Sequence, residues 1–331
     1  MPHSLSRIGR RRALRATTAG LVLLGILVWW LAPWDEEPPG GTITVSTGTR
    51  AGVYQKYGEL LRSSLGKHMP DLDVRLETSD GSQENVRRVA TGEADFAIAA
   101  ADAVETYRLE DRPGADGLRG VARLYDDYVQ LAVARDSGIH SVDDLRGKHV
   151  AIGPPKSGVR LIANRVLRAA GIDPETDIRP SSDGIDKGPE RLGHGLDAFF
   201  WSGGLPTDGL KTFAERNALR FVPIRADLVA ELHKQGGATR YYRATNMPAS
   251  AYPGSQLGAP VPTMAVSNLL ITRTDADPRL TEWLTRIVLK SRDGIGAHVH
   301  SAQLVDVRTA IYTDPLLLHE GARRYYRSVK P

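Results

Sequence analysis

The sequence of 331 residues contains no cysteine and no internal repeat. The absence of cysteine excludes disulfide bonds, thiolate metal sites, cysteine nucleophiles and lipid attachment to an N-terminal cysteine. His298 and His300 flank Val299, but no carboxylate or third ligand lies near them in the sequence. We therefore predict that the protein binds no metal and is held together by packing and hydrogen bonds alone.

Motifs of several enzyme classes are also missing. The sequence has no G-x-S-x-G elbow, no H-E-x-x-H, and no G-x-G-x-x-G that follows a strand. The segment GPPKSGVR at 153–160 begins like a Walker loop, but Val159 and Arg160 replace the lysine and hydroxyl residue that hold phosphates and magnesium. Asp126 and Asp127 are adjacent on an expected strand, so they should point to opposite faces. We predict no enzymatic activity and no cofactor.

The excess of basic over acidic side chains is confined to the N-terminal end. The chain carries 43 Lys and Arg against 39 Asp and Glu. Before residue 35 the charged side chains are all arginines: Arg7, Arg10, Arg11, Arg12 and Arg15. The rest of the chain is nearly neutral and has no dense basic stripe of the kind that neutralises phosphates. Nucleic-acid binding is therefore not expected.

The one long uncharged run lies at residues 16–34, ATTAGLVLLGILVWWLAPW. Its nineteen residues, at about 1.5 Å each, are just enough to cross a hydrocarbon core of ~30 Å. The preceding arginines and the acidic residues that follow predict a cytoplasmic N-terminus and an extracytoplasmic remainder. Residues 1–34 are thus interpreted as a basic end with a transmembrane helix, and 35–41 as a linker. A cleaved signal, which would release a secreted protein, remains the alternative, although no clear cleavage site is present.

From residue 42 onward, strand and helix patterns alternate, which is typical of an α/β fold. Strands are expected at 42–46, 72–76, 96–101, 121–136, 149–152, 219–224 and 263–273, with helices beginning near 53, 82, 143 and 158 and again from 278. We expect two lobes: 42–130 as lobe 1, 131–262 as lobe 2, and 263–331 as a return strand with C-terminal helices on lobe 1. Loops at strand ends open onto helix N-termini, whose N–H groups accept small anions.

Several stretches, taken in order, resemble one family. They are ITVSTGTRAGVYQKYGELL, SDGSQEN followed by GEADFAI, LYDDYVQLAVA, DDLRGKHVAIGPPKSGVR, LDAFFWSGGLPT and HEGARRYYR. Together they are similar to the TAXI solute-binding proteins, the extracytoplasmic components of TRAP-type transporters. The resemblance implies a two-lobed type 2 periplasmic-binding-protein fold with two crossing hinge strands.

The function implied by the resemblance is extracytoplasmic capture of a small anionic solute, an amino acid or organic acid, by lobe closure. The solute would pass to a TRAP-type membrane permease. A second hypothesis is a membrane-anchored sensor or adaptor that signals to a partner such as a sensor kinase, because a retained anchor suits local signalling equally well.

The resemblance also implies a set of ligand contacts. They are Thr47, Gly48, Thr49 and Tyr54 in the first corner, Ser82 and Asn85 in the second, Ser157, Gly158 and Arg160 in the opposing lobe, Trp201, Gly203 and Gly204 as the floor, and Asp102 and Tyr125 near the lobe junction. Each has a structural alternative: Tyr54 and Trp201 as core aromatics, and Ser82 and Asp102 as helix caps.

The sequence departs from the family pattern at four positions. Arg50 and Ala51 replace small residues and a second glycine, Ala100 stands where glutamine is common, and Val159 where threonine is expected. Two polar contacts are lost in this way, each worth about 0.5 to 1.5 kcal/mol. Arg50 would favour an anionic solute if it faced inward, and an orientation toward solvent is an equal alternative.

Overall fold

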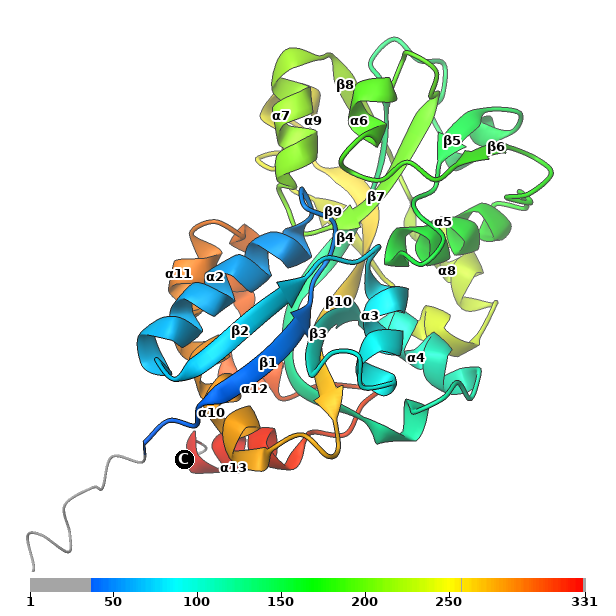
Figure 1. Ribbon diagram of the computed structural model, residues 1–331. Coiled ribbons are helices and arrows are strands. Elements are labelled where there is room, and N and C mark those ends of the chain that lie inside the picture. The colour runs from blue at the N-terminus through cyan, green and yellow to red at the C-terminus, as the bar shows by residue number, and fades with distance from the viewer. Residues whose placement is uncertain (1–36, 257, 330–331) are drawn as a thin grey trace, which may run out of the picture. The chain divides into compact units, whose positions relative to one another are not determined.

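The computed structural model describes residues 37–256 and 258–329 (Figure 1). Residues from Pro38 onward form one compact unit, which is described here by itself. The predicted transmembrane segment 16–34 lies outside the described residues. Within the described part, no helix combines the length and the apolar composition needed to cross a membrane.

A mixed sheet of ten strands runs through the unit, with the order β2-β1-β3-β10-β4-β7-β5-β6, while β8 pairs with β4 and β9 with β10. The strands are β1 Gly41–Ser46, β2 Leu72–Glu77, β3 Phe96–Ala100, β4 Leu118–Ala134, β5 His149–Ala151, β6 Arg179–Ser181, β7 Ala198–Gly203, β8 Leu219–Val222, β9 Arg243–Met247 and β10 Val261–Arg273. The groups β1–β3 and β5–β7 are each parallel, whereas β4 and β10 are antiparallel to their neighbours.

Helices connect and cover these strands. They are α2 Val53–His68, α3 Ser82–Ala90, α4 Ala101–Leu109, α5 Gly158–Ala169, α6 Gly188–Arg191, α7 Asp208–Arg216, α8 Ala226–His233, α9 Pro253–Gln256, α10 Pro278–Lys290, α11 Arg292–Gly296, α12 Val307–Ala310 and α13 Glu320–Val329, with 3-10 turns that include η2 Val142–Leu145 and η3 Gly237–Tyr241. Parallel strands require such crossover connections, which places the helices on both faces of the sheet.

The unit has two halves, each with its own apolar packing. We call β1–β3 with α2–α4 and α10–α13 the first half, and β5–β8 with α5–α9 the second half. In the first half, α2 and α10 cover one face of the strands, and α3 and α4 cover the other. In the second half, α5 packs on β7, and α8 packs on α5 and beside β9 and β10. Because both faces of β3 are covered, all five of its residues are buried.

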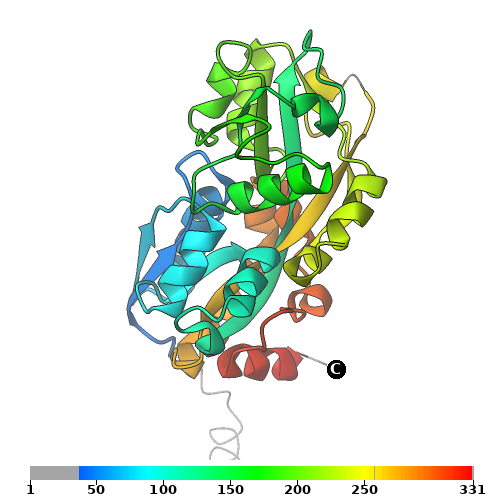
Figure 2. The same cartoon turned by 90° about the vertical axis from the view of Figure 1, so that its right-hand side faces the viewer.

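Two long strands join the halves. β4 pairs with β10 as far as Tyr128 and then with β7 and β8 up to Ala134. β10 pairs with β9 at one end and with β3 at the other. Figures 1 and 2 show both strands running from the first half into the second. The expected pair of crossing strands is therefore present.

Most expected elements are present with small shifts at their ends. The strand expected at 121–136 occupies 118–134, and the strand expected at 96–101 stops at Ala100 because Ala101 already begins α4. Two short strands, β6 and β9, were not predicted. β6 contains Pro180 and β9 is mostly exposed, so neither shows the apolar alternation of a covered strand.

Candidate ligand-binding site

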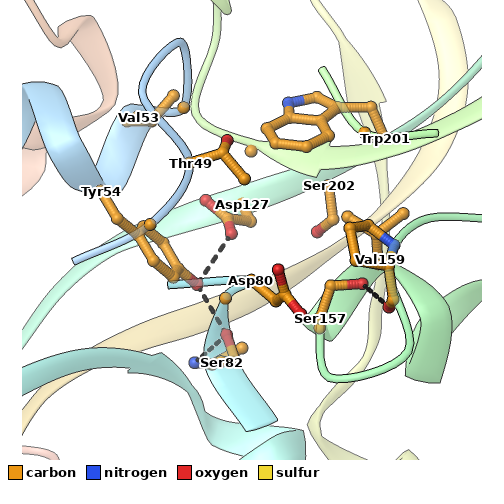
Figure 3. Close-up of a pocket in the computed structure, with 18 of the residues that line it drawn as sticks. Thr49, Val53, Tyr54, Asp80, Ser82, Asp127, Ser157, Val159, Trp201 and Ser202 are labelled. Atoms are coloured by element: carbon orange, nitrogen blue, oxygen red, sulfur yellow. Dashed lines mark hydrogen bonds between the residues drawn. The ribbon is translucent and has the colours of Figure 1, made fainter. Parts of the chain in front are cut away.

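A cavity of about 560 Å³, which includes the open space at its mouth, lies between the first and second halves (Figure 3). Eight of the predicted contact residues line it: Gly48, Thr49, Tyr54, Ser82, Ser157, Gly158, Trp201 and Gly203. The lining also includes Asp80, Asp127 and Ser202, which the sequence had not indicated, and the two departures Ala100 and Val159.

Three helices begin at this cavity. α2 follows Gly52, α3 follows Gly81, and α5 follows Ser157. The first-turn N–H groups of a helix have no partner within the helix, and they form its positive end. Gly81 has φ +129°, a conformation that L side chains rarely adopt, and its Cα faces Ser157 and Gly158 of the other half. The glycine thus permits the backbone conformation at the start of α3, and an added Cβ would be in ordinary contact with the other half.

Tyr54 is the centre of a buried chain of hydrogen bonds. Its hydroxyl lies 3.0 Å from Ser82 Oγ, 2.5 Å from Asn268 Oδ1 and 3.2 Å from Asp127 Oδ2. Ser82 Oγ accepts a bond of 3.1 Å from the Ala100 N–H, which leaves the serine proton for Tyr54. Burial raises the pKa of Tyr54 well above its usual value, and the charge of Asp127 raises it further. Tyr54 is therefore a neutral donor aimed at the two acceptors on the crossing strands.

Asp127 is the deepest charged group of the lining. It is 3% exposed, and burial raises the pKa of its carboxyl group to about 7. The neighbouring amide of Asn268, whose Nδ2 is itself without a hydrogen-bond partner in the described part, and the hydroxyl of Tyr54 lower this pKa in part, whereas the charges of Asp126 and Asp102 raise it. The oxygen Oδ2 accepts from Tyr54, but within the described part Oδ1 has no hydrogen-bond partner.

Two further polar atoms of the lining are buried without a partner in the described part of the chain. They are Thr49 Oγ1, before α2, and Ser202 Oγ, on β7. Together with Asp127 Oδ1 they come from three separate elements and share one cavity. Unpaired buried polar atoms are rare in proteins and each costs about 1 to 3 kcal/mol. Their convergence is what a site for a polar ligand requires.

Trp201 forms an apolar wall of the cavity in the second half. Its indole stacks on Phe199 with the ring centroids 6.5 Å apart, and its Nε1 donates a bond of 3.0 Å to Thr207 Oγ1. A Cβ added to Gly203 would lie 2.5 Å from that Nε1, so glycine is needed for the indole to keep its place. Trp201 thus packs as a core aromatic residue and also lines the cavity, so it has both of the roles that were considered from the sequence.

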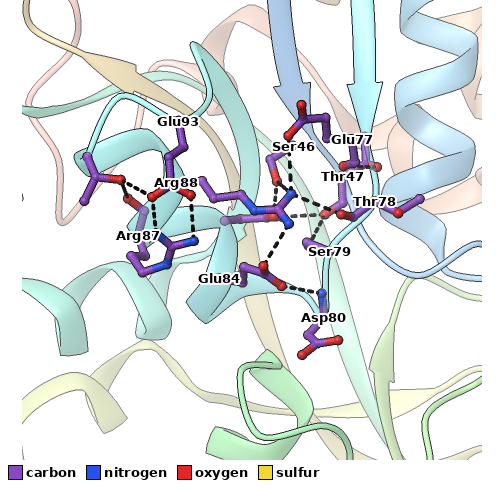
Figure 4. Close-up of polar contacts among 12 residues, drawn as sticks. Ser46, Thr47, Glu77, Thr78, Ser79, Asp80, Glu84, Arg87, Arg88 and Glu93 are labelled. Atoms are coloured by element: carbon purple, nitrogen blue, oxygen red, sulfur yellow. Dashed lines mark hydrogen bonds and ion pairs between the residues drawn. The ribbon is translucent and has the colours of Figure 1, made fainter.

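The corner before α3 is fixed by an ion-pair network (Figure 4). Arg88 donates to Ser46 Oγ at 3.1 Å and to the Thr78 carbonyl at 3.0 Å, and it pairs with Glu84 at 2.8 Å. Glu84 in turn accepts the Asp80 N–H at 2.8 Å. These contacts join β1, the loop after β2 and α3, so the corner is held before any ligand arrives.

Six of the predicted contacts lie outside the lining: Thr47, Asn85, Asp102, Tyr125, Arg160 and Gly204. Asn85 is fully buried and donates to the carbonyls of Thr47, at 2.5 Å, and Ile98, at 2.7 Å. Thr47 bonds to Gln55 and to the Glu77 carbonyl. These two residues tie β1, β3 and α3 together beneath the corner and do not face the cavity.

The other four have structural partners of their own. Arg160 turns back to the Gly153 carbonyl and to Ser182, each at 2.8 Å. Asp102 lies in the first turn of α4 and pairs with Arg165 at 3.1 Å. The other two are packed against side chains: Tyr125 against Tyr57, and Gly204 against Ser301. Arg50 is exposed and does not line this cavity, so the orientation toward solvent is the one observed.

The sequence signals for Asp127 and Ser202 were weak. Asp127 was weighed only as half of an acid–base pair, and the structure does place the two aspartates apart: Asp126 pairs with Arg123 and Arg243. A polar residue in the buried middle of a crossing strand was the available signal. Among the described residues, no group of three or more acidic or histidine side chains is arranged to hold a metal ion.

Several solved structures share this fold at low sequence identity. A putative L-cystine ABC transporter protein from Listeria monocytogenes has a TM-score of 0.50 and 14% identity over 80% of this chain and 98% of that one. A protein from Bordetella bronchiseptica RB50 has a TM-score of 0.50 and 15% identity over 88% of this chain and 90% of that one. The periplasmic aliphatic sulphonate binding protein SsuA from Escherichia coli has a TM-score of 0.44 and 14% identity, with coverages of 88% and 84%. The protein thus has an α/β fold that resembles that of periplasmic binding proteins. The chain belongs to the NMT1-like family, whose model matches residues 45–329.

Proposed function

We propose that the protein captures a small solute on the extracytoplasmic side of the membrane by closing its two halves around it. The observation that carries this proposal is the set of three unpaired polar atoms, Thr49 Oγ1, Asp127 Oδ1 and Ser202 Oγ, that share one cavity. A solute with complementary groups would satisfy all three at once. Neither half alone supplies the full set, so binding and closure would be coupled.

Closure in this proposal is a hinge motion about β4 and β10. The lobes are residues 42–130 with 263–331, and residues 131–262. The solute binds one lobe, and the other lobe rotates onto the bound solute. Because the solute has a higher affinity for the closed state, binding shifts the population of the protein from open to closed. Exclusion of water strengthens the charged contacts inside. No bond of the solute is made or broken.

Delivery to a TRAP-type permease is the further part of the proposal. It is supported by the resemblance of the sequence to TAXI proteins over nearly the whole ectodomain. When the lobes are closed, residues of both lobes would form one surface that a membrane partner can bind. The segment 16–34 would keep the protein at the outer face of the membrane, close to that partner.

A thermal-shift panel on the full-length protein tests solute capture. It includes amino acids, amines, 2-hydroxy acids, dicarboxylates, sulfonates and sugars, and each compound is checked for turnover. A solute at 100 times its dissociation constant stabilises a binder by ~2.7 kcal/mol. Ser202→Ala should reduce the shift, while Ser63→Ala on the exposed face of α2 should not. Turnover of a compound, or equal shifts in both variants, would count against the proposal.

A further inference from the structure

The lining of the cavity has acidic side chains and lacks basic ones. Among the described residues that line it, two are carboxylates, Asp80 and Asp127, and none is lysine, arginine or histidine. Arg160 is engaged by the Gly153 carbonyl and Ser182, and Arg50 is exposed outside the lining. An anionic solute would meet no cationic side chain here, although bidentate arginine contacts are the usual means of holding a carboxylate.

Among the described residues, no basic side chain forms an ion pair with Asp127. Tyr54 of α2 and Asn268 of β10 face it as neutral hydrogen-bonding groups. The remaining ionisable neighbours are acids and a tyrosine: Asp126 on β4, already paired with two arginines, Asp102 on α4, paired with Arg165, and Tyr125 beside it. A buried carboxylate that is left unpaired is costly, and a donor that carries positive charge is the partner that offsets this cost most.

The helix N-termini at the cavity favour a negatively charged group on the solute, whereas Asp127 favours a positively charged one. α2, α3 and α5 all begin at the cavity. The Glu84 N–H of α3 is bound to the Lys156 carbonyl and the Arg160 N–H of α5 to Ser157 Oγ, and the other first-turn N–H groups form the positive ends that face a ligand. Such ends accept a carboxylate or sulfonate without a basic side chain. The cavity therefore offers a negative group on β4 and a set of amide donors on the facing corners, which together match a molecule that carries both signs of charge.

We propose that the solute carries a protonated amine that donates to Asp127 Oδ1, together with an acidic group held by the amides of the helix starts. Amino acids and small aminosulfonates belong to this class, whereas organic acids without an amine do not. The inference rests on the proposed function and refines it, because the sequence had indicated an anionic solute without distinguishing these two groups. Asp127 is then the residue that determines which charge the site accepts.

Matched pairs of compounds test the inference. Calorimetric titration of the full-length protein compares the strongest binder from the panel with its analogue in which the amine is replaced by a hydroxyl group. The amine should bind at least 10-fold more tightly, since a charged hydrogen bond is lost in the analogue. Asp127→Asn should weaken the amine by about 10- to 100-fold and the analogue by less than 3-fold. Asp116→Asn, a change at an exposed site, is the control.

Proton exchange gives a second readout. A cation beside Asp127 lowers the pKa of that carboxyl group, so binding near pH 7 should release protons, and Asp127→Asn should abolish the release. A solute that lacks an amine and binds best, proton uptake on binding, or unchanged affinity in Asp127→Asn would overturn the inference while solute capture stands. A panel in which no compound binds would instead count against the proposed function, and the inference would fall with it.

Discussion

The side-chain amide of Gln83 on α3 donates a hydrogen bond of 2.6 Å to the main-chain oxygen of Ser157, the residue that caps α5 in the other half. The adjacent Glu84 N–H donates to the Lys156 carbonyl at 3.1 Å. On the other side of the cavity, the Ala51 N–H donates to Asp186 at 3.0 Å. The facing corners are therefore in contact, and opening of the halves would break all three bonds.

Gln83→Ala should weaken solute binding by about 2- to 10-fold, because one neutral hydrogen bond of the closed state is worth about 0.5 to 1.5 kcal/mol. The matched control is Gln235→Ala, whose amide donates to the Arg165 carbonyl within the second half at 3.0 Å. Calorimetric titration of the strongest binder measures both. Equal losses of affinity in the two variants would contradict a specific role of the Gln83 bond in closure.

Gly158→Ala should disfavour the closed arrangement. An added Cβ would lie 3.1 Å from Ser82 Oγ and 3.2 Å from its Cβ, so the halves would have to separate by a few tenths of an ångström. Overpacking of this kind typically costs about 1 to 3 kcal/mol. Small-angle scattering with solute should show a larger radius of gyration than in the unchanged protein. Gly66→Ala on α2, which meets no atom within 4 Å, is the control and should leave the scattering unchanged.

Arg165→Met should destabilise the protein strongly. Arg165 bonds to Asp102 at 3.1 Å, Tyr242 at 2.7 Å and Thr106 at 2.7 Å, and Asp102 is fully buried. Removal of the arginine leaves the buried carboxylate without its cationic partner and with the hydroxyl of Tyr242 as a remaining donor, which costs about 3 to 5 kcal/mol. Chemical denaturation measures the loss in the free energy of unfolding. Arg75→Met breaks an exposed pair with Asp73 and should cost less than about 1 kcal/mol; losses of similar size would refute the argument.

Asp127 should make the unliganded protein less stable as the pH rises. Its folded pKa is about 7, above the unfolded value of about 3.9, so between these values the folded state binds more protons than the unfolded state. The free energy of unfolding then falls by about 1.4 kcal/mol for each pH unit from pH 5 toward 7 and is constant above it. Asp127→Asn should remove this fall.

Denaturation of both proteins at pH 5 and pH 8 checks the prediction. Other groups with shifted pKa values that are not coupled to Asp127, such as His319, are present in both proteins and cancel in the comparison. The stability of Asp127→Asn relative to the unchanged protein should be higher at pH 8 than at pH 5. A difference that is the same at both pH values would show that Asp127 stays ionised in the folded protein.

The fold was largely predictable from the sequence because its elements are covered and periodic. The β1–α2–β2 unit and the long strands β4 and β10 carry clear apolar patterns, and the glycines at 81 and 158 mark the corners. β6 and β9 carry no such pattern because they are short and exposed. Their pairing depends on neighbouring strands and not on their own residues.

The site was predictable only in part because a corner residue can point into the cavity or beneath it. Ser82 and Asn85 lie on one turn of α3, yet only Ser82 lines the cavity, while Asn85 holds two carbonyls below it. Asp127 was not predicted as a ligand contact because its neighbours lie on other elements. They come close to it only when β4, β10 and α2 pack together. The spacing of residues predicts which side chains share one face of a helix or strand, whereas tertiary packing determines which of these faces lines the cavity.

The most direct test of the account is a crystal structure of the full-length protein with the compound that stabilises it most. The account predicts one intact molecule between the halves, in contact with Asp127 Oδ1 and Ser202 Oγ and with the N–H groups that begin α5. A molecule bound elsewhere on the surface, or one chemically altered by the protein, would contradict it.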